Sequence, residues 1–90
     1  MRFRDNTAEQ RYELDAPEGL SFADYRDAGG VRVLPHVETD PNARGLGYAA
    51  KLMEAIVVHA RAEGLKLRPR CGYAVAWFAR QRGAADDVLA

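Results

Sequence analysis

The sequence predicts an α+β fold in which a mostly antiparallel, twisted sheet of about five strands carries two helices. Residues 1–39 contain short alternating runs separated by turn signals, which is typical of antiparallel strands. Tyr48–Glu63 has apolar residues at helical spacing, and Gly64 and a second short alternating run follow it. This order predicts one β–α–β crossover at the C-terminal end of the sheet.

Composition limits the size of the fold and the classes of partner. The 90 residues are enough for a single domain, residues 1–90, and Lys plus Arg balance Asp plus Glu at 13 each. A balanced charge gives no reason to expect nucleic acid, and no run approaches the roughly 18 apolar residues of a membrane span. The lone Cys71 has no internal disulfide partner, which fits a reducing compartment. We therefore expect a cytoplasmic protein, without a membrane partner, that is a monomer or a weak homodimer.

Four strands are expected before the first helix. Ala16-Pro17-Glu18-Gly19 reads as a turn, and Asp27-Ala28-Gly29-Gly30 is a strong hairpin signal. In the third strand, Leu20, Phe22 and Asp24 share one face. The expected strands are Met1–Arg4, Arg11–Leu14, Leu20–Tyr25 and Val31–Thr39.

The fourth strand is the longest, and simple alternation divides it into two faces. One face would hold Val31, Val33, Pro35, Val37 and Thr39, and the other Arg32, Leu34, His36 and Glu38. Pro35 has no N–H to donate to a neighbouring strand. We therefore expect the strand to be irregular or unpaired on that side.

The second half of the chain completes the crossover. Gly64 is the expected cap of the first helix, and Leu65–Pro69 should return to the sheet as a strand parallel to the fourth. A second helix is expected over Gly72–Gln81, and Gly83–Ala90 should form a short turn and a frayed end. The apolar stripe of the first helix comprises Ala49, Leu52, Met53, Ile56, Val57 and Ala60. The residues expected to be partly buried in the second helix are Tyr73, Val75, Ala76, Trp77 and Ala79.

The segment Arg44-Gly45-Leu46-Gly47-Tyr48-Ala49 joins the fourth strand to the first helix. The first N–H groups of a helix lack partners and carry partial positive charge, so an anion binds well there. Gly45 and Gly47 allow a tight turn and close approach, and Arg44 adds a positive side chain. A plain glycine-rich linker is an equally good interpretation of the spacing alone.

In their order along the chain, these elements resemble the GNAT N-acetyltransferases. The turn fits the pattern Arg/Gln-x-x-Gly-x-Gly/Ala of that superfamily. The series His36-Val37-Glu38, Pro41, the glycine turn, Gly64-Leu65-Lys66 and Pro69-x-Cys71-x-Tyr73 is similar to very short GNAT-like proteins. The resemblance implies a minimal GNAT fold that covers nearly the whole chain.

The resemblance also implies that acetyl-coenzyme A is the cofactor. Its pyrophosphate would lie on the turn amides, and its pantetheine arm would lie beside the fourth strand, in a gap between the fourth and fifth strands. The expected cofactor-binding residues are Val37, Glu38, Thr39, Arg44, Gly45, Leu46, Gly47, Tyr48, Ala49, Cys71 and Tyr73.

Three residues are candidates for the chemistry. His36 and Glu38 share a face and can take a proton from an amine, although both can equally be plain surface residues. Cys71 lies where a strand should end and a helix begin, which tends to lower a thiol pKa. It can be a nucleophile, an acid for the leaving thiolate or a small buried hydrophobe. The tyrosine that most GNAT enzymes carry further along is replaced here by Trp77-Phe78.

Other chemistries lack their motifs. There is no paired Cys or His spacing for a metal, no nucleotide-triphosphate loop and no Gly-x-Ser-x-Gly turn. Two functions stay open. One is an N-acetyltransferase that uses acetyl-coenzyme A and acts on an amine exposed on a protein or peptide. The other is a non-catalytic module that binds coenzyme A or its acyl derivatives.

Overall fold

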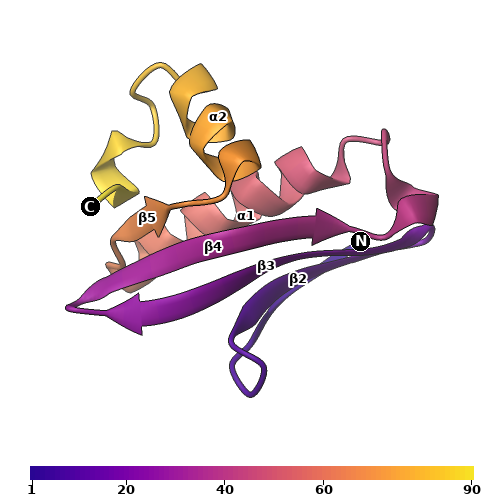
Figure 1. Ribbon diagram of the computed structural model, residues 1–90, viewed down its shortest axis with the longest axis horizontal. Coiled ribbons are helices and arrows are strands. Elements are labelled where there is room, and N and C mark those ends of the chain that lie inside the picture. The colour runs from indigo at the N-terminus through magenta and orange to yellow at the C-terminus, as the bar shows by residue number, and fades with distance from the viewer.

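The computed structural model describes residues 1–90, and it confirms the predicted α+β fold (Figure 1). One five-stranded sheet has the order β1-β2-β3-β4-β5; the first three pairings are antiparallel, and β4 and β5 are parallel. The strands are β1 (Arg2–Asn6), β2 (Arg11–Ala16), β3 (Gly19–Ala28), β4 (Val31–Thr39) and β5 (Leu67–Pro69). The helices are α1 (Tyr48–Glu63) and α2 (Gly72–Arg80), with 3-10 turns η1 (Pro41–Ala43) and η2 (Asp86–Val88).

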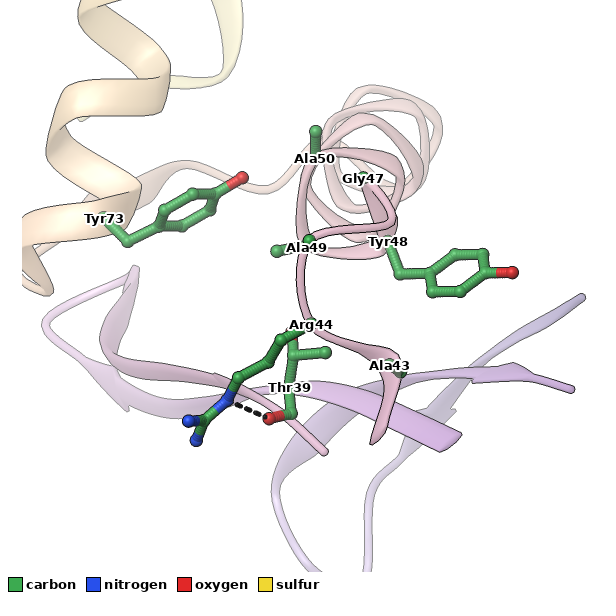
Figure 2. A pocket seen from close by; sticks show the side chains of 9 residues that line it. Thr39, Ala43, Arg44, Gly47, Tyr48, Ala49, Ala50 and Tyr73 are labelled. Atoms are coloured by element: carbon green, nitrogen blue, oxygen red, sulfur yellow. Dashed lines mark hydrogen bonds between the residues drawn. The ribbon is translucent and has the colours of Figure 1, made fainter. Parts of the chain in front are cut away.

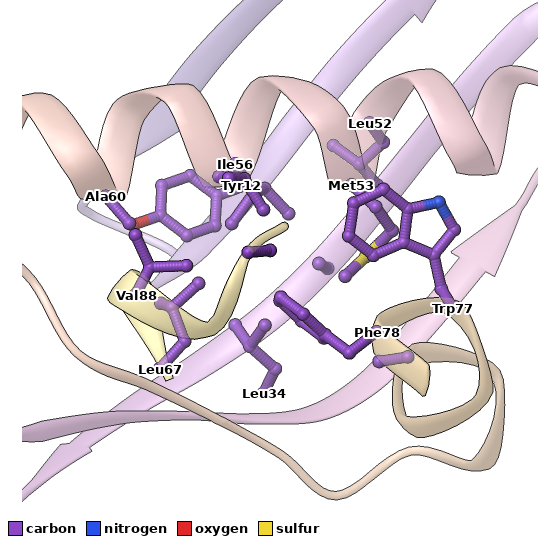
Figure 3. Close-up of a cluster of buried hydrophobic side chains, with 14 of the residues drawn as sticks. Tyr12, Leu34, Leu52, Met53, Ile56, Ala60, Leu67, Trp77, Phe78 and Val88 are labelled. Carbon is purple, nitrogen blue, oxygen red and sulfur yellow. The ribbon is translucent and has the colours of Figure 1, made fainter. Parts of the chain in front are cut away.

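The core lies between the sheet and the two helices, which lie on the same side of the sheet (Figure 1, Figure 3). Helix α1 buries the predicted stripe except for Ala49 in its first turn, which is partly exposed. Glu54, Val58 and Arg61 lie on the exposed side of the helix. Gly64 ends the helix in the left-handed conformation, and its N–H bonds to Ala60 O. Because no helix covers the other side of the sheet, that outer face stays open.

Strand β4 contains the irregularity expected at Pro35, and this irregularity overturns the predicted faces. Asp24 pairs with His36 but Arg26 pairs with Val33, so Leu34 and Pro35 together lie opposite Tyr25. The extra residue reverses the alternation. Leu34 is fully buried, and Val37 packs against the same core, whereas His36 and Glu38 are exposed on the outer face. The prediction that Leu34 shares a face with His36 and Glu38 is therefore wrong.

Strand β3 confirms that Leu20, Phe22 and Asp24 share one face, whereas helix α2 buries a different set of side chains from the expected one. In β3 the buried face is that of Ser21, Ala23 and Tyr25, while Leu20, Phe22 and Asp24 are partly exposed on the outer face. In α2 the buried residues are Ala74, Trp77 and Phe78, whereas Val75, Ala76 and Ala79 are exposed. Trp77 and Phe78 enter the core together, with their rings edge to face (Figure 3).

The C-terminal segment is ordered, so the prediction of a frayed end is wrong. Val88 is 1% exposed and packs in the core, and Ala90 N–H donates to Leu67 O at 2.9 Å beside β5. Arg61 of α1 pairs with Asp87 at 2.6 Å. These contacts give the short strand β5 a neighbour on its outer edge (Figure 1). No helix of the protein has both the length and the apolar character needed to cross a membrane.

Candidate functional site

The turn between β4 and α1 leaves the start of α1 without a side-chain cap. Gly45 and Gly47 have φ values of 78° and 82°, a region that residues with a Cβ avoid. Gly47 occupies the N-cap position, so no side chain bonds to the first amides, and the first turn contains no acidic residue. Asp40 instead caps the preceding 3-10 turn through Asn42 N–H at 2.8 Å. The first N–H groups of α1 are therefore available to an anion.

A pocket of about 300 Å³ opens beside this turn (Figure 2). That volume is at the lower end of the range for ligand pockets. Tyr73 of α2 faces the first turn of α1, and the Arg44 side chain reaches back to Thr39, where Nε donates to the carbonyl oxygen at 3.1 Å (Figure 2). The lining residues are Thr39, Ala43, Arg44, Gly45, Gly47, Tyr48, Ala49, Ala50 and Tyr73.

The end of β4 presents an unpaired edge next to the pocket. Asp40 N–H donates to Leu20 O, and in an antiparallel pair such bonds alternate. Val37 and Thr39 therefore direct their backbone groups away from β3. On that side β5 pairs with β4 only as far as Leu34, because the chain then turns into α2. No strand therefore pairs with residues 37–39 on this side, which is where the resemblance implies a gap between the fourth and fifth strands.

Cys71 lies at this gap, where its thiol faces the Val37 amide. Partial burial opposes ionisation of the thiol, but the backbone N–H groups of Ala74, Val37 and Tyr73 favour the thiolate, and together they lower the Cys71 pKa. Cys71 lies between the start of α2 and the open edge of β4, and it does not line the pocket.

His36 and Glu38 come together, but outside the pocket. His36 Nε2 lies 3.1 Å from Glu38 Oε1, and both side chains are about half exposed on the outer face. The His36 ring also contacts Phe22 of β3, with the ring centroids 6.1 Å apart. The backbone of β4 separates this pair from the gap. His36 and Glu38 lie on the outer face of the sheet, and Val37 between them faces the helices.

The residues that line the pocket differ in part from the expected cofactor-binding residues. Ala43 and Ala50 line it, and small side chains at loop and helix positions give no sequence signal of such a role. Leu46 is half exposed and lies outside the lining. Glu38 lies on the outer face, and Val37 is at the edge. Two phenols line the pocket, those of Tyr48 and Tyr73, and burial raises the pKa of the Tyr73 phenol.

The donor set suits a ligand that carries a diphosphate and a long polar arm. The uncapped amides and Arg44 can hold phosphate oxygens, and the edge of β4 can hydrogen-bond an extended arm with amide groups. No three His, Cys, Asp or Glu side chains are grouped as a metal site would require.

The mixed five-stranded sheet, the single crossover and the uncapped glycine turn define the fold of the acyltransferases that the sequence resembles. The profile of the GCN5-related N-acetyltransferase family matches residues 11–88. The chain therefore belongs to that family, and membership supports acyl transfer as its general activity.

A solved structure agrees on the fold. It is the solution structure of a GCN5-like protein from Staphylococcus aureus, described as a candidate N-acetyltransferase. The similarity covers 99% of this chain and 87% of that one, with a TM-score of 0.67 and 22% sequence identity. Among curated proteins, none matches this sequence.

Proposed function

We propose that this protein transfers an acetyl group from acetyl-coenzyme A to the amine of a protein or peptide. The observation that supports this function most strongly is the pocket at the uncapped start of α1, which continues toward the unpaired edge of β4. Gly45, Gly47 and Arg44 would hold the pyrophosphate, and Val37 and Thr39 would bind the pantetheine arm through their backbone groups. Bound there, the cofactor supplies a reactive acetyl thioester.

His36 and Glu38 are the proposed route for the proton that the amine must lose. An alkyl amine such as that of lysine is protonated near neutral pH and cannot attack a carbonyl in that form. Glu38 and His36 are in hydrogen-bond contact at 3.1 Å and face solvent, so either can accept the proton and pass it on. The amine would approach across the outer face, while the cofactor binds from the α1 side.

Cys71 is the proposed acid at the sulfur side of the reaction. The C–S bond of the thioester breaks as the new C–N bond forms, and the departing thiolate needs a proton. A lowered pKa makes the Cys71 thiol a better proton donor, and it also makes the residue a better nucleophile. An acetylated Cys71 would show as added mass, which separates the two roles.

The open outer face supports a large acceptor. No helix covers this face, so the surface beside His36 and Glu38 has no walls that would enclose a small metabolite. An exposed lysine or an N-terminal amine on a protein surface can reach such a site. Free polyamines that turn over well, with peptides that do not, would contradict this acceptor class.

Two measurements on one sample test the proposal. Acetyl-coenzyme A should raise the melting temperature through ligand linkage, and a panel of peptides should gain acetyl mass in its presence. Loss of transfer in Glu38→Gln and His36→Ala, with the thermal shift retained, would fit their proton-transfer role. No thermal shift with the wild-type protein would reject the cofactor.

A non-catalytic module that binds coenzyme A is the second candidate. It is favoured by one observation: His36 and Glu38 lie on the opposite side of β4 from the pocket. Binding without any transfer, or a rate of thioester hydrolysis that does not change when His36, Glu38 and Cys71 are all replaced, would favour this module.

A further inference from the structure

We infer that Glu18 is a positioning residue for the cofactor turn, acting through the Tyr48 phenol; this inference rests on the proposed function. Tyr48 is the first residue of α1 and lines the pocket, and its hydroxyl donates to Glu18 Oε1 at 2.6 Å. Glu18 itself lies in the turn between β2 and β3 and does not line the pocket.

The turn needs such a contact because few side-chain hydrogen bonds hold it in place. A helix start is usually fixed by a capping side chain, but Gly47 provides none. Two side-chain hydrogen bonds connect residues 44–49 to the sheet, namely Arg44 to Thr39 O and Tyr48 to Glu18. The Arg44 guanidinium is also the proposed phosphate ligand. When it turns to a phosphate, Tyr48–Glu18 is the remaining side-chain hydrogen bond of this segment to the sheet.

The Glu18 end of the contact is itself well fixed. The neighbouring Gly19 packs so closely against Asp40 that an added Cβ would lie 2.7 Å from the Asp40 Cβ. Leu20 O also accepts the Asp40 N–H at 2.8 Å. The turn between β2 and β3 is therefore held against the segment that leads into the cofactor turn, and Glu18 can hold Tyr48 in place.

For binding of coenzyme A, the hold of Glu18 on Tyr48 should outweigh the negative charge of Glu18. A carboxylate near a diphosphate is electrostatically unfavourable, so a charge effect alone would make Glu18 weaken cofactor binding. A positioning effect has the opposite sign, because a fixed turn loses less conformational freedom when the ligand binds. Glu18→Gln separates the two effects, since glutamine keeps the acceptor oxygen and loses the charge.

The test is the affinity for coenzyme A, measured by calorimetry at one ionic strength. Glu18→Ala and Tyr48→Phe should each weaken binding about three- to tenfold, as expected for the loss of one hydrogen bond. The double variant should bind coenzyme A as well as the single variant with the lower affinity, because both changes remove the same contact. Glu18→Gln should bind as tightly as the wild type or tighter.

A second readout needs no ligand. Lys51 N–H bonds to Gly47 O at 3.2 Å in the first turn of α1, so its hydrogen exchange reports on that turn. Exchange at Lys51 should be faster in Glu18→Ala than in the wild type. Asp87→Ala is the matched control, because it removes a comparable exposed contact, to Arg61. It should change neither the affinity for coenzyme A nor the hydrogen exchange at Lys51.

The outcomes distinguish the two proposals. Wild-type protein that does not bind coenzyme A overturns the proposed function and this inference with it. Wild-type protein that binds, with unchanged affinity and exchange in Glu18→Ala, overturns the inference alone. Additive losses in the double variant also overturn it, because they would mean that Glu18 and Tyr48 act separately.

Discussion

At Gly47, the missing side chain has two consequences for the cofactor turn. The residue adopts a φ of 82°, which lets the chain turn from η1 into α1, and it leaves the first helix amides without a cap. A Cβ at this position would meet no atom within 4 Å, so only the backbone conformation opposes a larger residue. Gly64 has a similar φ of 66° and equally open surroundings, at the other end of α1.

These two glycines give a matched pair of variants. Gly47→Ala and Gly64→Ala should each lower the free energy of unfolding by about 1 kcal/mol, because alanine is disfavoured at positive φ. Only Gly47→Ala should also weaken binding of coenzyme A, since Gly64 is far from the pocket. Urea unfolding and calorimetry measure the two quantities. Equal loss of binding in both variants would mean that the effect comes from stability and not from the turn.

Cys71 should titrate below the usual range of a thiol. Partial burial raises its pKa, but the N–H groups of Ala74, Val37 and Tyr73 outweigh that effect and lower it from 9.0. Thiolate should therefore accumulate at a lower pH than in an unfolded peptide. Ultraviolet absorbance of the thiolate against pH measures this in the native protein, with the urea-unfolded protein as the reference. A native transition at or above the unfolded one would contradict the arrangement.

At the scale of the elements, strand β4 shows where sequence reasoning succeeds and where it stops. The missing N–H of Pro35 predicted an irregular strand, and the bulge is at that residue. Its effect on the faces could not be predicted, because a bulge reverses the alternation only if the extra residue is accommodated on β4. Leu34 therefore joins the core, and the outer face starts again at His36.

The outer face of the sheet holds one buried carboxylate, and stability should depend on it. Glu13 is 2% exposed and accepts hydrogen bonds from Arg4, Arg11 and Asn6. Burial raises its pKa, but the bonds from Arg11, Asn6 and Arg4 outweigh burial, so the pKa is lowered below 4.5. Its contribution is then complete above the unfolded pKa and is lost as pH falls through the folded one.

Glu13→Gln should therefore lower the free energy of unfolding by about 1–3 kcal/mol at pH 7 and flatten its decline in acid. Urea unfolding between pH 7 and pH 3 measures both effects. Asp15→Asn is the control, because Asp15 lies on β2 like Glu13 and also pairs with Arg4, but its side chain is half exposed. A decline in Glu13→Gln as steep as in the wild type would contradict this role of Glu13.

The C-terminal segment provides a prediction for an element that the sequence did not reveal. Val88→Ala should cost about 1–3 kcal/mol, because Val88 is 1% exposed in the core. Val58→Ala makes the same chemical change at a valine that is 64% exposed, and it should be neutral or slightly stabilising in a helix. A neutral Val88→Ala variant in urea unfolding would mean that the end is frayed after all.

For the whole molecule, the strand order, the crossover and the long helix follow from periodicity and turn residues. The glycine turn was also found from the sequence, since its residues are adjacent in the chain. The rest of the site joins distant segments. Tyr48 meets Glu18 across 30 residues, and Cys71 meets the Val37 amide across the gap. Contacts of this kind depend on the packed fold and leave no local pattern.

The central claim is that coenzyme A binds at the β4–α1 turn and along the open edge of β4. Titration of the 15N-labelled protein with coenzyme A, followed through its backbone amide signals, tests this most directly. The predicted result is shifts concentrated at Val37, Thr39, Gly45–Ala50, Cys71 and Tyr73. No shifts, or shifts centred on the small hollow beside Arg61, Lys66 and Asp87, would contradict it.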